Sequence, residues 1–223
     1  DTTQVNFTYN LDYETRFDNR EFFRSAFTRS MTIFGARLTP SVGVELSQPD
    51  NGMSHRMMVG IDIMKDFGAS PVSEGLAGAG SPETLSRQQN LDLLREVIMY
   101  YRLEKRTPET TLGLYAGIFP RSTAHGAYSE AFFSDSLRFY DNNLEGILFK
   151  VTRPKSYFEV GCDWLGKQGI ARKEKFMIFS AAEKAVTKSF HLGYAAYMYH
   201  FAGSKKARGV VDNILMNPYA RLD

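Results

Sequence analysis

A net charge of +2, from 27 basic and 25 acidic side chains among 223 residues, gives the chain no strong field for nucleic acid. Its only cysteine, Cys162, excludes an intrachain disulfide, and no apolar stretch reaches the roughly 18 residues that a transmembrane helix needs. Aromatic residues make up 13% of the chain, and both a soluble β-rich protein and a membrane β-barrel fit this composition.

The first pattern along the chain is an alternation over VNFTYNLDYETRF, residues 5–17. Apolar or aromatic residues such as Val5, Phe7 and Leu11 take every second position, and mostly polar residues lie between them. A period of two predicts a strand with one apolar and one polar face. The stretch is far longer than the ~5–6 residues of an average strand, and this length suits a membrane crossing better than a small sandwich.

The same alternation recurs to the end of the chain. It is clear in TLGLYAGIF and YFEVGCDWLG, and weaker where apolar residues occupy parts of both faces. No long helical pattern and no internal repeat interrupts it. The pattern predicts ten strands, at residues 4–17, 31–47, 55–65, 91–104, 110–119, 143–152, 156–165, 174–183, 189–201 and 208–216.

The predicted connections alternate in length. Those after odd strands have 13, 25, 23, 8 and 6 residues, whereas those after even strands have 7, 5, 3 and 5. This sorting is typical of an up-and-down outer-membrane barrel, with short periplasmic turns and longer extracellular loops. We therefore expect residues 66–90 and 120–142 to be extracellular. The turns at 48–54, 105–109, 153–155 and 184–188 should be periplasmic, as should the N-terminus.

Several long blocks carry a resemblance to a known group. They are TRFDNREFF, HRMMVGIDIMKDFG, LYAGIFPRS, AFFSDSLRFYDNNLEGILFK, EKFMIFSA, YMYHFAGS and VVDNILMNPYARLD. In these blocks the chain resembles porin-like outer-membrane β-barrel proteins of Bacteroidota, a largely uncharacterised group. The resemblance implies the fold and an outer-membrane location, and it supplies no catalytic residues. Chains of the group continue beyond the equivalent of Asp223, so we expect residues 1–223 to form one β-barrel domain that is incomplete at its C-terminal end.

The alternation also predicts which side chains face lipid, although a soluble barrel or sandwich would show the same pattern with its apolar face inward. Strand length, the two classes of connection and aromatic residues near strand ends favour the membrane. The residues expected to contact lipid are Val5, Phe7, Leu11, Val42, Val44, Val59, Ile61, Leu112, Leu114, Val160 and Trp164.

Sequence motifs for catalysis are missing. The chain lacks the phosphate-binding, zinc-hydrolase, paired-cysteine and nucleophile-elbow patterns. A triad could be assembled from Ser134, His125 and Asp135, but a triad is recognised by geometry, and a loop of this composition permits one by chance. We therefore predict no enzyme activity, no cofactor and no metal site.

Residues 120–142 form the most informative connection. Six large apolar or aromatic groups lie within it, which predicts that it folds inward against the wall of the barrel and narrows a pore. The residues expected to line the constriction are Arg121, Glu130, Asp135, Arg138 and Asp141, and those expected on the wall are Glu45, Asp62, Glu159 and Asp163. Mixed charges on such a wall suit neutral polar solutes such as sugars better than one class of ion.

The sequence thus predicts an all-β, antiparallel up-and-down transmembrane β-barrel in the outer membrane. Its predicted function is passive passage of small polar solutes, with the lipid bilayer as its surroundings and partner subunits as possible neighbours. Two alternatives stay open. One is a closed outer-membrane barrel that serves as a scaffold or surface-interaction partner, and the other is a soluble, secreted β-protein that binds carbohydrate.

Overall fold

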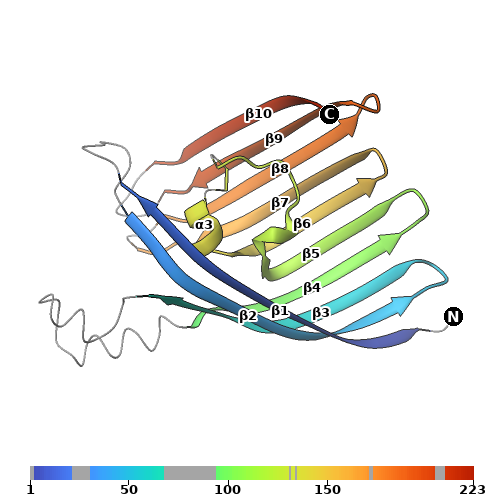
Figure 1. The fold of residues 1–223 in the computed structure, drawn as a ribbon, viewed down its shortest axis with the longest axis horizontal. Helices are drawn as coiled ribbons and strands as arrows, with labels where there is room; N and C mark the ends of the chain where they lie inside the picture. Colours follow the sequence, from blue (N-terminus) through green and yellow to red (C-terminus); the bar gives the residue numbers. More distant parts are fainter. Residues whose placement is uncertain are drawn as a thin grey trace, which may run out of the picture. The chain divides into compact units, whose positions relative to one another are not determined.

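The computed structural model describes residues 3–21, 31–67, 94–130, 132–133, 135–170, 173–203 and 209–223 (Figure 1). All ten predicted strands are present, with bounds close to those expected. They are β1 (Gln4–Arg20), β2 (Met31–Gln48), β3 (Met53–Asp66), β4 (Leu94–Arg106), β5 (Thr111–Pro120), β6 (Asn143–Arg153), β7 (Ser156–Gly166), β8 (Lys175–Ala185), β9 (Phe190–Phe201) and β10 (Val211–Leu222).

The strands form one ten-stranded sheet in chain order, from β1 to β10. The ladders from β4 to β10 are antiparallel, so the predicted up-and-down, all-β architecture is confirmed. The sheet stays open in the described part of the chain, because β1 and β10 are its two end strands. β10 runs past Pro218, which the prediction treated as beyond the strand. An end strand tolerates proline because one of its edges needs no backbone donor.

The chain divides into two compact units, each described here by itself. The first comprises Asp1–Asn6, Val44–Met57 and Met99–Asp223, and it contains all of β5 to β10. The second comprises Phe7–Gly43 and Met58–Ile98. Within the described residues, no helix is long and apolar enough to cross a membrane.

In the first unit the strand connections sort to two edges of the sheet (Figure 1). The turns after β4, β6 and β8 lie at one end, which we call the short-turn edge. The connections after β5, β7 and β9 lie at the opposite end, which we call the long-loop edge. This separation agrees with the alternation of connection lengths in the sequence.

The two faces of the sheet differ in the way that a membrane wall requires. In β6 to β9 the apolar face exposes Ile147, Phe149, Phe158, Trp164, Ile178 and Leu192, whereas the opposite, covered face buries Leu148, Lys150, Glu159, Asp163 and Phe179. In the second unit Val59 and Ile61 are likewise exposed, and Arg37 and Asp62 are buried. Of the eleven residues predicted to face lipid, nine are exposed, and Leu114 and Val160 are half-buried. These side chains form no dry core, contrary to what a soluble sandwich would require.

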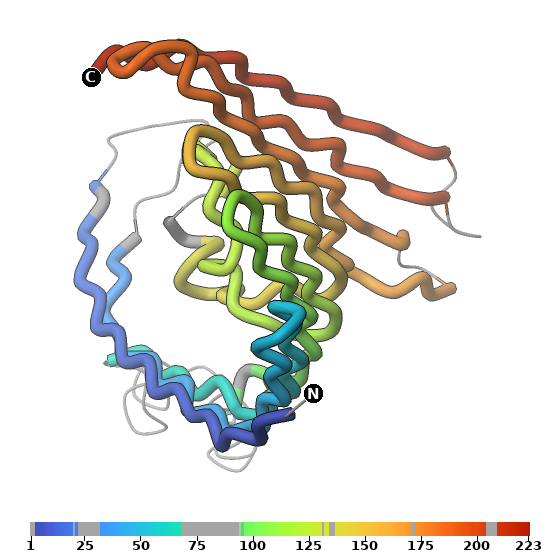
Figure 2. Tube along the Cα trace, turned by 90° about the vertical axis from the view of Figure 1, so that its right-hand side faces the viewer, coloured from blue at the N-terminus to red at the C-terminus, as the bar shows by residue number. Residues whose placement is uncertain are grey.

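The connection between β5 and β6 packs on the covered face (Figure 2). It contains a 3₁₀ turn, η1 (Arg121–Thr123), and a short helix, α3 (Asp135–Tyr140). Tyr128 and Phe133 lie against Phe179 of β8, with ring centroids 5.7 and 5.5 Å from it. Gly161 of β7 leaves the space that the Phe179 ring fills, since a side chain there would collide with it. The predicted packing of this loop on the wall is confirmed, and a narrowed pore stays a prediction.

Candidate functional site at the long-loop edge

Arg121 and Asp163 form a buried ion pair between the β5–β6 loop and β7. Their charged atoms are 2.8 Å apart, and each side chain is 2% exposed. The Arg121 guanidinium also donates to the backbone oxygens of Asp141 and Asn143 at 3.0 and 2.9 Å. Asp163 accepts a further hydrogen bond from the backbone N–H of Glu145 at 3.0 Å. The pair therefore attaches the start of the loop to the sheet.

Glu159 secures the next part of the same loop. Its carboxylate accepts hydrogen bonds from the backbone N–H groups of His125 and Gly126, at 3.1 and 2.8 Å. Lys150 lies 3.9 Å from it and donates to the Thr123 carbonyl. Burial, and then the Lys150 charge, lower the pKa of His125, while Glu159 acts in the opposite direction. Glu159 thus binds backbone, which leaves it little capacity for a solute.

The other predicted pore residues lie in different surroundings. Glu130, Arg138 and Asp141 are exposed, and Asp141 pairs with Arg121 at 3.4 Å. Asp135 begins α3, but its side chain lies outside the described atoms, as does all of Ser134, so the triad with His125 stays untested. Two wall residues are paired with arginines: Glu45 with Arg56 and Arg102 in the first unit, and Asp62 with Arg37 in the second. Whether any of these groups borders a pore stays a prediction.

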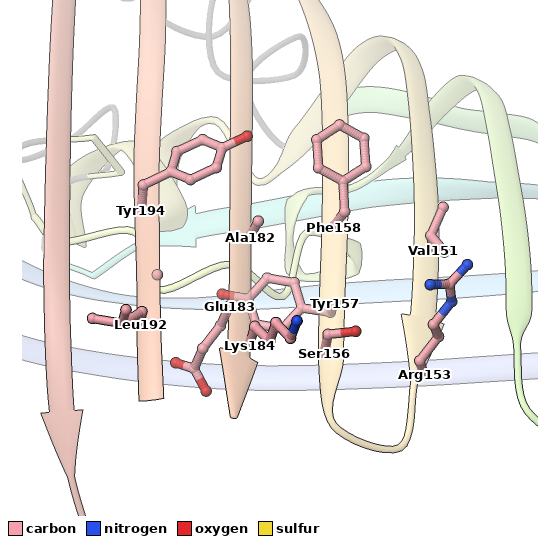
Figure 3. Close-up of a pocket in the computed structure, with 11 residues that line it drawn as sticks. Val151, Arg153, Ser156, Tyr157, Phe158, Ala182, Glu183, Lys184, Leu192 and Tyr194 are labelled. Atoms are coloured by element: carbon pink, nitrogen blue, oxygen red, sulfur yellow. The ribbon is translucent and has the colours of Figure 1, made fainter. Parts of the chain in front are cut away.

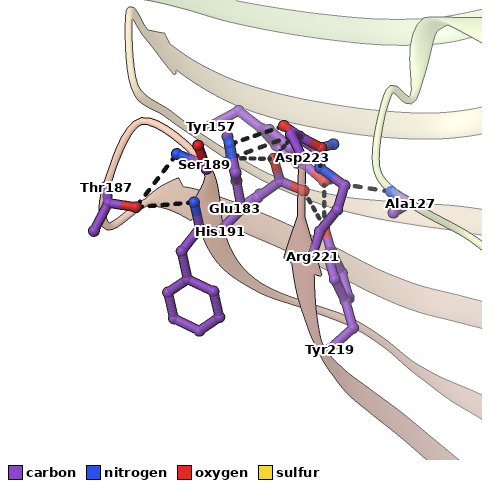
Figure 4. Close-up of polar contacts among 10 residues, drawn as sticks. Ala127, Tyr157, Glu183, Thr187, Ser189, His191, Tyr219, Arg221 and Asp223 are labelled. Carbon is purple, nitrogen blue, oxygen red and sulfur yellow. Dashed lines mark hydrogen bonds and ion pairs between the residues drawn. The ribbon is translucent and has the colours of Figure 1, made fainter.

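A second polar network ties the loop to β10 near the short-turn edge (Figure 4). Tyr157 accepts from the Ala127 N–H at 3.3 Å and contacts the Tyr219 hydroxyl, which donates to Glu183 at 2.8 Å. His191 has one ring nitrogen 3.2 Å from Glu183 and the other 3.2 Å from Asp223. With a carboxylate at each nitrogen, this histidine is held as a structural tie between β8 and the residue that follows β10.

The apolar face carries an unexpected polar pair at the long-loop edge. Trp164, Phe176, His200 and Asp212 are successive cross-strand neighbours on β7, β8, β9 and β10. The Trp164 and Phe176 rings stack at 5.6 Å, and the Phe176 and His200 rings stack at 4.6 Å. We call these four residues the aromatic row. It ends in a 2.6 Å contact between His200 Nδ1 and Asp212 Oδ1.

The orientation of His200 is that of a general base. Its Nδ1 is held by the carboxylate, while no described residue makes a hydrogen bond to its Nε2. When Nδ1–H donates to the carboxylate, Nε2 is the acceptor of the neutral ring. The His200 side chain is 21% exposed, so a ligand at the surface can reach it.

A depression of about 760 Å³ borders the row at Trp164. It is lined by Glu145, Trp164, Leu165, Gly166, Lys167, Gln168 and Glu174. An aromatic ring beside carboxylate, amide and ammonium groups is suited to a polar headgroup that carries hydroxyls. The described side chains include no group of three or more ligands arranged to hold a metal ion.

Sequence reasoning missed this site, although a sign of it was present. His200 and Asp212 occupy positions that the alternation assigns to the apolar face, where neighbours such as Met198 and Ile214 are apolar. Polar exceptions on such a face are expensive and are therefore candidates for function. Their pairing depends on the register of β9 and β10, which the sequence pattern does not specify.

The chain matches one protein-family model over most of its length. A family model described as Lipid A 3'-O-deacylase-type matches residues 2–217, and the search of curated proteins found no match. The description names an enzyme activity, so the prediction that the chain is no enzyme is wrong. The match is compatible with an outer-membrane β-protein, while the resemblance to porin-like barrels stays a prediction. Because the match spans nearly the whole sequence, the chain belongs to the Lipid A 3'-O-deacylase-type family.

Proposed function

We propose that the protein is an outer-membrane hydrolase that removes an ester-linked acyl chain from a glycolipid of the lipid A type. The observation that carries this proposal is the His200–Asp212 pair on the apolar face at the long-loop edge, where His200 is half-buried and Asp212 is exposed. The family description supports the reaction class, and the exposed apolar face supports the location in the membrane.

The length of the apolar face supports a position of the pair near one boundary of the hydrocarbon. Phe176 and Lys184 point to this face near opposite ends of β8, and the eight residue steps between them span ~26 Å along the strand, or ~20 Å along the membrane normal at the ~40° tilt of a barrel strand. The apolar band of an outer-membrane barrel is ~25 Å tall, with aromatic residues at its borders. With the long loops outside, the aromatic row meets the outer leaflet at the depth of the ester bonds.

The residues present can perform the ester hydrolysis without a covalent intermediate. His200 Nε2 takes a proton from a water molecule, whose oxygen attacks the ester carbonyl carbon. The tetrahedral intermediate collapses and breaks the bond between that carbon and the sugar oxygen, and His200 returns the proton to this oxygen. Asp212 stabilises the imidazolium between the two steps. The depression beside Trp164 holds the headgroup.

The test is hydrolysis of purified lipid A by the protein in mixed micelles, followed by mass spectrometry of the products. His200→Ala should lower the rate about 10²–10⁴-fold, the usual contribution of a positioned base. His191→Ala is the matched control, since it removes a histidine of the covered face and should leave the rate unchanged. Unchanged hydrolysis by His200→Ala would move the site elsewhere, and an inactive parent protein would refute the hydrolase.

Passive passage of small polar solutes is the second candidate. It is favoured by the mixed charges of the covered face, including Glu45 with Arg56 and Arg102, which are all partly exposed. Planar-bilayer conductance tests it, and deleting residues 124–138 should raise the conductance if the loop narrows a pore. A folded protein without conductance would favour a closed barrel.

A further inference from the structure

We propose that the apolar face carries a second lipid site, at the short-turn edge, which binds an anionic phospholipid of the inner leaflet. This inference depends on the proposed membrane location and is independent of the proposed hydrolysis. It rests on a depression of about 510 Å³ over β6 to β9 (Figure 3).

Eight of the eleven residues that line the depression form two cross-strand rows, and Tyr157, Glu183 and Gly193 complete the lining. The row nearer the turns is Arg153, Ser156, Lys184 and Leu192, and the row nearer the centre of the sheet is Val151, Phe158, Ala182 and Tyr194. Figure 3 shows the two rows one above the other. The outer row is mostly polar, the inner row is apolar or aromatic, and two residues along a strand separate them by ~7 Å. A phospholipid needs the same order, because its polar headgroup lies toward the membrane surface and its acyl chain lies toward the middle of the bilayer.

The outer row is suited to a phosphate. Ser156 lies between Arg153 and Lys184, each one strand away, or ~4.8 Å. Both cations are exposed, and in the described structure neither makes an ion pair. Glu183, the adjacent carboxylate of β8, points to the covered face and is engaged by Arg221 and Tyr219. The two cations therefore present two positive charges with a hydroxyl between them, which complements a phosphodiester.

The inner row is suited to an acyl chain. The small side chain of Ala182 leaves a groove between the larger side chains of Phe158 and Tyr194, which are its neighbours on the adjacent strands. The next residue of this face on β8 is Ser180, whose hydroxyl bonds to the Glu159 carbonyl at 2.9 Å and to the Tyr194 hydroxyl at 3.0 Å. Since these polar groups satisfy one another, the floor of the groove stays compatible with hydrocarbon.

The main experiment measures lipid preference at the groove itself. Trp164 is the only tryptophan, so Trp164→Phe with Tyr194→Trp places a single fluorophore in the inner row. Quenching by brominated phosphatidylglycerol and by brominated phosphatidylcholine then gives their relative affinity. We expect phosphatidylglycerol to be preferred, and the preference to fall about fivefold for each cation removed in Arg153→Gln and Lys184→Gln. Lys188→Gln, in the adjacent turn, is the control and should keep the preference.

A second measurement does not depend on the fluorophore. Native mass spectrometry of the unsubstituted protein should show retained phosphatidylglycerol, and the Arg153→Gln/Lys184→Gln variant should lose it. Ala182→Leu fills the groove without changing a charge and should also release the lipid. Equal affinity for the two lipids, or a preference that survives removal of both cations, would overturn the proposal.

Discussion

At the scale of single residues, the covered face is dominated by buried charge. Arg121 and Asp163 are almost completely removed from solvent, and every further contact of the guanidinium described above is to an oxygen atom. Taking two charges out of water is costly, and such a pair persists only when the geometry satisfies both partners. The attraction between the two charges therefore adds little net stability, whereas removing one partner would leave the other charge buried and unpaired at a large cost.

We predict that Arg121→Met destabilises the fold by about 3–5 kcal/mol, because Asp163 would remain buried without its cation. Asp141→Asn should cost less than about 1 kcal/mol, since Asp141 is 47% exposed and its contact with Arg121 is screened. Urea unfolding in liposomes, followed by the fluorescence of the single tryptophan, measures both variants. Equal losses of unfolding free energy in the two variants would show that the buried ion pair contributes no more to stability than the exposed contact.

At the scale of elements, β8 illustrates how one strand serves two environments. Ile178 is exposed on the apolar face, whereas its neighbours Met177 and Phe179 are buried beneath the β5–β6 loop. Moving along the same face, Lys184 lies at the short-turn edge and is exposed. The strand thus presents hydrocarbon-compatible groups in its middle and a charge at its end.

A guanidinium at Ile178 should therefore be more harmful than one at Lys184. We expect Ile178→Arg to cost about 2–4 kcal/mol, the range measured for arginine near the midplane of a barrel wall. Lys184→Arg places the same group at the edge and should change the unfolding free energy by less than about 1 kcal/mol. Refolding into liposomes and urea titration give both values. A harmless Ile178→Arg would mean that this face is bathed in water.

The sequence predicted the strands and faces well, because both follow from a period of two that needs no knowledge of neighbours. It predicted the packing of Tyr128 and Phe133 for a similar reason, since such groups have to be buried somewhere. It could not predict that Arg121 meets Asp163, or that His200 meets Asp212. These contacts join distant segments and depend on strand register and on the course of a loop.

At the scale of the whole molecule, the sorting of connections predicts an orientation for the proposed outer-membrane protein. The turn containing Glu109 lies at the short-turn edge, and the β7–β8 connection containing Lys167 lies at the long-loop edge. The 66–90 connection, also predicted to be extracellular, lies mostly outside the described residues. Long loops of outer-membrane barrels face the exterior of the cell.

This direction can be tested in a Cys162→Ser background, which removes the only thiol. Lys167→Cys should react with an impermeant thiol reagent on intact cells, because its loop is expected outside. Glu109→Cys should react only after the outer membrane is permeabilised. The reverse pattern would invert the orientation and place the His200–Asp212 pair at the inner leaflet.

The separation of charge and hydrocarbon between the two faces also bears on how the chain assembles. A slip of one residue in β7 would turn Glu159 and Asp163 toward the apolar face and would bring Phe158 and Trp164 against the charged groups of the loop. Each carboxylate misplaced in this way would cost several kcal/mol in the bilayer. A misaligned strand would therefore tend to leave the membrane rather than persist there. For the proposed membrane protein, the bilayer would thus select the correctly aligned hairpins during insertion.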